Sequence, residues 1–163
     1  MDSEIIKLQS KEGKSYTLSK KQAELSILLK NTIQDFQGDI VVPLTEIDDK
    51  TTGRVVDYLT HFNGELPVEL EKPLKSTEMS EVADTWSANF VDSLVLDDLV
   101  ELTVAANFLE INSLLDLCCA KFASMCKNKT DDEIFKTFNI TETFSEEEKA
   151  QIREENKWIE DNI

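Results

Sequence analysis

The sequence predicts an α+β protein in which an N-terminal α/β module of about three strands plus helices is followed by an all-helical extension. Near the start of the chain, apolar residues alternate with polar ones, which is the period of a half-buried strand. After Trp86, apolar residues recur at helical spacing and several capping signals mark helix starts. We therefore predict a first domain at residues 1–62, a linker at 63–85 and a helical region at 86–163.

The strands of the first domain follow from this alternation and from the turn residues beside it. Residues 6–9 and 15–18 alternate and are joined by a polar turn containing Gly13, which predicts a β-hairpin. A third strand is predicted at residues 40–44. Because Pro43 has no N–H to donate to a neighbouring strand, this strand should end there or lie at the edge of the sheet.

Two helices are predicted in the same domain. Ser19 followed by Gln22 is a capping box, which predicts a helix from residue 20 towards residue 33. Asp48 can cap a second helix, whose apolar residues fall on one stripe: Val55, Val56, Leu59 and Phe62. Residues 63–85 hold six acidic residues, two prolines and no sustained period, and so predict a flexible, solvated linker.

The helical region is divided by its capping signals. Asp98 with Glu101 resembles a capping box, and Asn112 can cap the next helix. The first of these helices has an apolar stripe made by Leu99, Leu102, Ala106 and Leu109. Two further capping boxes predict a short helix and a last helix, and they are Thr130 with Glu133 and Ser145 with Glu148.

The charge of the chain narrows the classes of partner. It has 33 Asp and Glu against 17 Lys and Arg, so the net charge is −16. Nucleic-acid binding depends on a basic patch, and the sequence has none, so a nucleic-acid partner is not expected. An anionic membrane surface would repel such a chain, and no apolar run approaches the ~20 residues of a membrane span. Protein partners are expected.

The cysteines favour a reducing compartment. Cys118, Cys119 and Cys126 are an odd number in one helix-like stretch, and adjacent cysteines on a helix do not suit a structural disulfide. No histidine or acidic residue stands at metal-ligand spacing from them, so a zinc site is not expected. The N-terminus shows no signal peptide. We expect a cytoplasmic and nuclear protein.

Catalytic signals are sparse. The single histidine, His61, ends an apolar helical stripe without a nucleophile or metal partner nearby, which favours a surface or partly packed residue. The four glycines are scattered and form no phosphate-binding loop, and solvated faces explain the many carboxylates. We expect no enzymatic activity and no cofactor.

Large apolar residues occupy more than one helical face between Leu99 and Cys126. One interpretation is that these helices are central and surrounded by the chain itself. The alternative is that a partner completes part of this surface, together with Phe135, Phe138 and Trp158, as in helix-in-groove recognition.

Several segments resemble the S-phase kinase-associated adaptor family, whose members link a cullin to an F-box protein in SCF-type ubiquitin ligases. The most characteristic segment is AANFLEI at residues 105–111, followed by LLD at 114–116. The resemblance covers nearly the whole chain except the acidic linker, and it continues in IKLQS at 6–10, VPL at 42–44, KTDDEI at 129–134, KTFNI at 136–140, FSEEE at 144–148 and EENKW at 154–158.

The resemblance implies a BTB/POZ-like domain followed by F-box-binding helices, with F-box proteins and a cullin as partners and a weak homodimer as an option for the free chain. On the same basis, the expected cullin-binding residues are Val42, Leu44, Ile47, Asn107 and Phe108. The expected F-box-binding residues are Val100, Leu114, Leu115, Cys118, Phe122, Ile134, Phe138, Ile140 and Trp158. Phe108 stands where the family usually has Tyr, Phe122 where a smaller apolar residue is usual, and Cys118 where Thr is common.

Two other functions compete with the adaptor. An acidic, chaperone-like protein could bind basic proteins through its net charge. A BTB adaptor like elongin C could bind a cullin and recruit substrates directly. The helical residues after Asn112, and Trp158 in particular, argue against the second, because such a protein needs no F-box platform.

Overall fold

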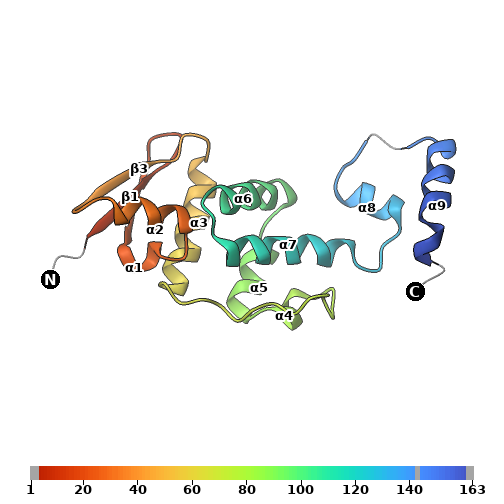
Figure 1. Ribbon diagram of the computed structural model, residues 1–163, viewed down its shortest axis with the longest axis horizontal. Helices are drawn as coiled ribbons and strands as arrows, with labels where there is room; N and C mark the ends of the chain where they lie inside the picture. Colours follow the sequence, from red (N-terminus) through yellow and green to blue (C-terminus); the bar gives the residue numbers. More distant parts are fainter. Residues whose placement is uncertain (1–3, 142–143, 161–163) are drawn as a thin grey trace. The chain divides into compact units, whose positions relative to one another are not determined.

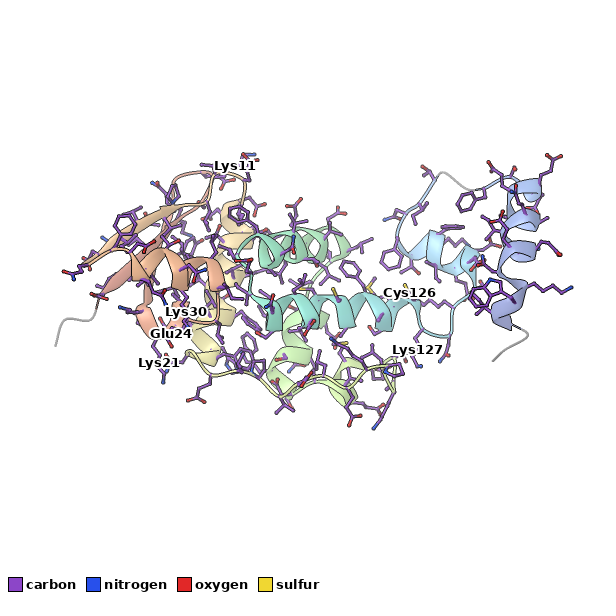
Figure 2. The ribbon with its side chains drawn as sticks, in the orientation of Figure 1. Lys11, Lys21, Glu24, Lys30, Cys126 and Lys127 are labelled. Carbon is purple, nitrogen blue, oxygen red and sulfur yellow. The ribbon has the colours of Figure 1, made fainter. Side chains whose placement is uncertain are left out.

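The computed structural model describes residues 4–141 and 144–160, and it confirms the mixed α+β class (Figure 1). The chain forms two compact units, the first up to Lys127 and the second from Asn128 onward. Lys127 follows the last helix of the first unit, next to Cys126 (Figure 2). The helical residues 86–127 therefore share a unit with the sheet, and the compact units do not follow the predicted boundaries at 62/63 and 85/86.

The sheet contains β1 (Ile5–Gln9), β2 (Ser15–Ser19) and β3 (Ile40–Pro43) in the order β2-β1-β3. β1 pairs with β2 in antiparallel and with β3 in parallel orientation. The side chains of the alternating residues Ile6, Leu8 and Leu18 point into the core and are buried there. β3 lies at an edge of this sheet, as Pro43 predicts.

The helix predicted at residues 20–33 is instead two helices, α1 (Lys20–Ala23) and α2 (Ile27–Gln34). The chain breaks at Ser26, whose hydroxyl accepts a hydrogen bond from the Leu29 N–H and so caps α2. A serine side chain competes in this way with the helical hydrogen bonds of its own backbone. The predicted capping box at Ser19 is confirmed. Helix α1 contacts β1 and β2 of the sheet, and α2 contacts α1 (Figure 1).

The next helix, α3 (Asp49–Phe62), begins at the predicted cap Asp48 and buries Val55, Tyr58 and Leu59. It ends in a left-handed turn, with φ of 48° at Asn63 and 82° at Gly64. A Cβ atom on Gly64 would lie 2.5 Å from the backbone oxygen of Lys21, a residue of α1 (labelled in Figure 2). The absence of a side chain at Gly64 therefore lets the end of α3 pack on α1.

Replacing Gly64 by Ala should lower the free energy of unfolding by about 1–3 kcal/mol, because both the left-handed backbone and the contact with Lys21 oppose a Cβ atom. Gly38→Ala is the matched control, since Gly38 also has a positive φ but has open space around its Cβ position. The measurement is the urea midpoint of the two variants. Equal losses would show that the contact with Lys21 contributes nothing.

Between α3 and α5 (Thr85–Asp92), the chain contains one short helix, α4 (Met79–Val82). Met79 is buried, and Leu70, Leu74 and Val82 pack against the core. Among the described residues, 63–78 form no helix or strand. The aperiodic sequence did not reveal α4, and these contacts anchor the predicted linker at several points.

Flexibility of the linker stays a prediction. We expect backbone amides between Glu65 and Glu81 to exchange with solvent faster than those of α3 or α6, because few of them belong to regular structure. Hydrogen exchange read by mass spectrometry measures this. Protection across this segment as slow as that of α3 would contradict it.

Two long helices complete the first unit, α6 (Leu96–Phe108) and α7 (Asn112–Cys126). The predicted stripe of α6 is buried, since Leu99, Leu102, Ala106 and Leu109 all lie in the core. The predicted caps are wrong: Val95 and Ile111 occupy the N-cap positions and make no side-chain cap hydrogen bond. Asp98 lies inside the first turn of α6, where its carboxylate interacts favourably with the helix dipole. The same carboxylate forms an ion pair with Arg54 of α3.

The second unit holds α8 (Asp131–Thr137) and α9 (Glu146–Glu160). The capping boxes at Thr130 and at Ser145 are confirmed by reciprocal hydrogen bonds to Glu133 and Glu148. None of the side chains described in these two helices is buried. Helices of this length are marginal in water without packing. Because this unit buries so little apolar surface, packing contributes little to its stability.

Candidate protein-interaction surfaces

The outer face of α6 carries a row of exposed apolar residues. Val100, Val104 and Phe108 follow one another at i, i+4 and i+8 and are 43%, 62% and 56% exposed. We call these three residues the α6 stripe. A helix of a monomeric domain normally turns one apolar face inward and a polar face outward. The α6 stripe is therefore a candidate contact surface for another protein.

The α6 stripe contains residues that the sequence analysis assigned to two different partners, the cullin and the F-box protein. Phe108 and Asn107 were predicted to contact the cullin, and both are exposed. Val100 was predicted to contact the F-box, yet it shares a helix face with Phe108. Val104 was missed, although its spacing of four residues from both Val100 and Phe108 could have identified it.

The N-terminus of α2 fixes the turn that follows Phe108. The hydroxyl of Ser26 is buried and donates a hydrogen bond to the carbonyl oxygen of Leu109. The Ile27 N–H donates to the carbonyl oxygen of Glu110, whose φ of 53° places it in the left-handed region. Leu109 and Ile111 are fully buried on either side of Glu110. The turn after the α6 stripe is thus held by the N-terminus of α2.

The other end of α6 is held by an ion cluster. One carboxylate oxygen of Asp98 lies 2.8 Å from Lys50 and 2.9 Å from Arg54, both on α3. Hydrogen bonds from Lys50 and Arg54 lower the pKa of Asp98, and burial opposes them only partly. Asp98 therefore stays ionised at neutral pH and joins α6 to α3.

Ser26→Ala should lower the free energy of unfolding by about 2 kcal/mol, because it removes a helix cap and leaves the Leu109 carbonyl without its buried donor. Ser19→Ala is the control, since Ser19 caps α1 without touching the turn, and it should cost about 1 kcal/mol. Chemical denaturation measures both, and amide exchange at Leu109–Ile111 should rise only in Ser26→Ala. Equal losses and an unchanged turn would refute the role of Ser26.

The other predicted cullin residues lie in or after β3. Leu44 and Ile47 are buried in the core, so their side chains support the surface from below and do not reach it. Val42 is half-buried, whereas Val41 is exposed and was missed. Alternation along the strand explains the difference, because successive side chains point to opposite faces.

The predicted F-box residues divide between the two units. On α7, Leu114 and Cys118 are buried in the core, and Leu115 and Phe122 are half-buried. Burial raises the pKa of the Cys118 thiol to about 12, so this cysteine behaves as a small apolar residue. The second unit carries the remaining four, of which Ile134 and Phe138 are half-buried and Ile140 and Trp158 are exposed.

His61 belongs to an aromatic cluster. Its ring stacks on Trp86 with centroids 3.9 Å apart, and Trp86 stacks in turn on Phe90 at 4.9 Å. Within residues 4–141 and 144–160, no group of three His, Cys, Asp or Glu side chains could hold a metal ion. Across the same part of the chain, no helix combines the length and the apolar character that crossing a membrane requires.

Comparison with known proteins places this arrangement in a family. The Skp1 family tetramerisation domain matches residues 4–64, the predicted POZ-type domain, and the Skp1 family dimerisation domain matches residues 112–159. The S-phase kinase-associated protein 1 homolog of Tetrahymena thermophila is 43% identical over 156 residues, covering 96% of this chain and 94% of that protein.

Two fungal relatives are similar over the same extent. The E3 ubiquitin ligase complex SCF subunit sconC of Arthroderma otae is 36% identical over 158 residues, covering 96% of this chain and 94% of the relative. Its namesake in Talaromyces stipitatus is 34% identical over 157 residues, covering 96% and 97%. Since the two domains match in order and these relatives align along nearly their whole length, the chain belongs to the Skp1 family.

Proposed function

We propose that this protein is a non-catalytic adaptor of an SCF-type ubiquitin ligase, which links F-box proteins to a cullin. The observation that carries the proposal is the α6 stripe, an exposed apolar face on a helix whose opposite face is already buried in the core. Relatives named as SCF subunits support it.

The cullin surface of the proposal comprises the α6 stripe with Asn107, and the exposed Val41 beside Val42 on β3. The exposed members are all uncharged, and they are apolar except for Asn107, whose amide is polar. Aromatic and aliphatic anchors of this kind carry most of the binding energy at protein interfaces. Leu44, Ile47 and the Ser26 contact serve this surface as structural support.

The F-box contacts of the proposal come from each unit separately: Leu115 and Phe122 of α7 in the first unit, and the apolar residues of the second unit. The second unit exposes Ile140, Phe144, Ile152, Trp158 and Ile159. A unit with so little apolar burial of its own gains stability when a partner covers these side chains. An elongin C-like adaptor would have no use for them, which favours the F-box function.

A charge-driven chaperone is the competing function, and an affinity pull-down from native lysate at 0.15 M and 1 M salt separates the two. At 1 M salt the Debye length falls to ~3 Å, so contacts made by charge alone are lost, while apolar docking persists. The adaptor function predicts that F-box proteins and a cullin dominate at both salt concentrations. Basic proteins that dominate at 0.15 M and disappear at 1 M would overturn it.

We also propose a cytoplasmic and nuclear location.

A further inference from the structure

A cavity of about 270 Å³ lies in the first unit, beneath the extended chain that connects α3 to α4. Residues 66–70 of that connection, which we call the strap, form one wall, and the beginnings of α5 and α7 form the others. In Figure 1 the strap belongs to the segment that leaves the end of α3 and leads towards α4. None of the predicted cullin or F-box residues lines this cavity.

Hydroxyl groups form the inner end of the cavity. Tyr58 is fully buried, and its phenol donates a hydrogen bond of 2.8 Å to the hydroxyl oxygen of Ser113. Burial raises the pKa of Tyr58 to about 12, so the phenol remains a donor at neutral pH. Ser113 accepts this hydrogen bond and can still donate its own proton to a ligand.

The charged groups of the cavity are all acidic. Glu69, Asp84 and Asp116 line it, whereas no lysine or arginine does. Although burial alone would raise the pKa of Asp84, hydrogen bonds from the Ser87 side chain and backbone lower it, so Asp84 is ionised. Asp116 makes one long ion pair, 3.5 Å to Lys72, and so keeps acceptor capacity for a second cation.

Part of the cavity lining is apolar. Leu66 and Val68 of the strap line it and are 79% and 87% exposed, while Leu117 and Ala83 contribute from the helices. A ligand that lies against the strap would bury part of this surface. The volume is just below the ~300–1,000 Å³ of typical drug-sized sites, which suits one ring or a short alkyl chain.

We propose that the strap cavity binds a small organic ammonium ion with an apolar body. The ammonium group pairs with the carboxylates of Glu69 and Asp116, and the apolar body lies against the strap. A bare metal ion is a poorer match, since no cluster of three possible ligands exists among the described residues. The negative field of a chain with net charge −16 adds to the selection of a cation.

Titration of the full chain with 2-phenylethylamine, followed by ¹H–¹⁵N NMR, tests the proposal, and the neutral isostere 2-phenylethanol is the control ligand. We expect saturable shifts confined to the strap and to Ser87, Asn112 and Ser113, with the alcohol binding at least tenfold more weakly. Amide exchange of the strap should slow in the presence of the amine.

A matched pair of variants locates the charge. Asp116→Asn should weaken amine binding at least threefold. Asp92→Asn should leave it unchanged, because Asp92 is likewise exposed and paired with one lysine but lies outside the cavity. Equal binding of amine and alcohol, equal effects of the two variants, or shifts that spread over the acidic surface without saturating would each overturn the proposal.

Discussion

Deleting residues 145–163 is expected to abolish F-box binding and to leave the affinity for the cullin unchanged. The deleted segment contains α9, whose Trp158 is 65% exposed. Truncating a large aromatic residue in a packed site costs roughly 3–5 kcal/mol, which is a loss of affinity of more than about 100-fold. The residues of the proposed cullin surface all precede residue 109 and stay in place.

Fluorescence anisotropy with a labelled F-box peptide and a labelled cullin fragment measures the two affinities separately. Trp158→Ala should reproduce most of the loss, while Lys157→Ala, a neighbouring exposed residue, should change binding little. If the deletion weakened both partners equally, the division of the chain into two binding surfaces would be wrong.

The emission of Trp158 reports on the same event. In a Trp86→Phe background, which removes the second tryptophan, we expect emission typical of an exposed indole that shifts to the blue when the F-box peptide is added. The shift follows from transfer of the indole from water into an apolar interface. An emission that is already blue and unresponsive would show that Trp158 is packed on its own chain and is no anchor.

Replacing Phe108 by Glu should weaken cullin binding by at least ~2 kcal/mol, about thirtyfold, because it replaces the aromatic anchor of the α6 stripe with a charge. F-box affinity and thermal stability should hardly change, since the side chain is 56% exposed and α6 packs through its other face. Val95→Glu is the control, because Val95 is also exposed but lies at the opposite end of α6. A drop in thermal stability, or equal loss of both partners, would show that Phe108 belongs to the core.

The sequence predicted those parts of the fold that depend on local pattern. Alternation was enough for β1 and β2. The missing N–H of Pro43 predicted that β3 ends there or lies at an edge, and β3 does both. The capping boxes at Ser19, Thr130 and Ser145 depend on residues three positions apart, and each was found correctly.

Features that depend on contacts between distant segments were not predictable. Ser26 looked like an ordinary helix residue, and its role appears only where α2 meets the turn at Leu109, 83 residues further on. Val95 begins α6 without a side-chain cap, whereas Asp98, which resembled a cap in the sequence, pairs instead with Lys50 and Arg54 of α3. For the same reason, Leu44 and Ile47 were taken for surface residues, although the folded chain places them in the core.

Reconstitution of the ternary complex tests the adaptor function most directly. A purified F-box protein and a purified cullin fragment are mixed with and without this chain and separated by size-exclusion chromatography. The adaptor function predicts that all three co-elute in equal amounts, that the two partners elute separately without the chain, and that Phe108→Glu releases only the cullin. Competition between the cullin and the F-box protein for the chain, or co-elution of the two in its absence, would contradict the proposed function.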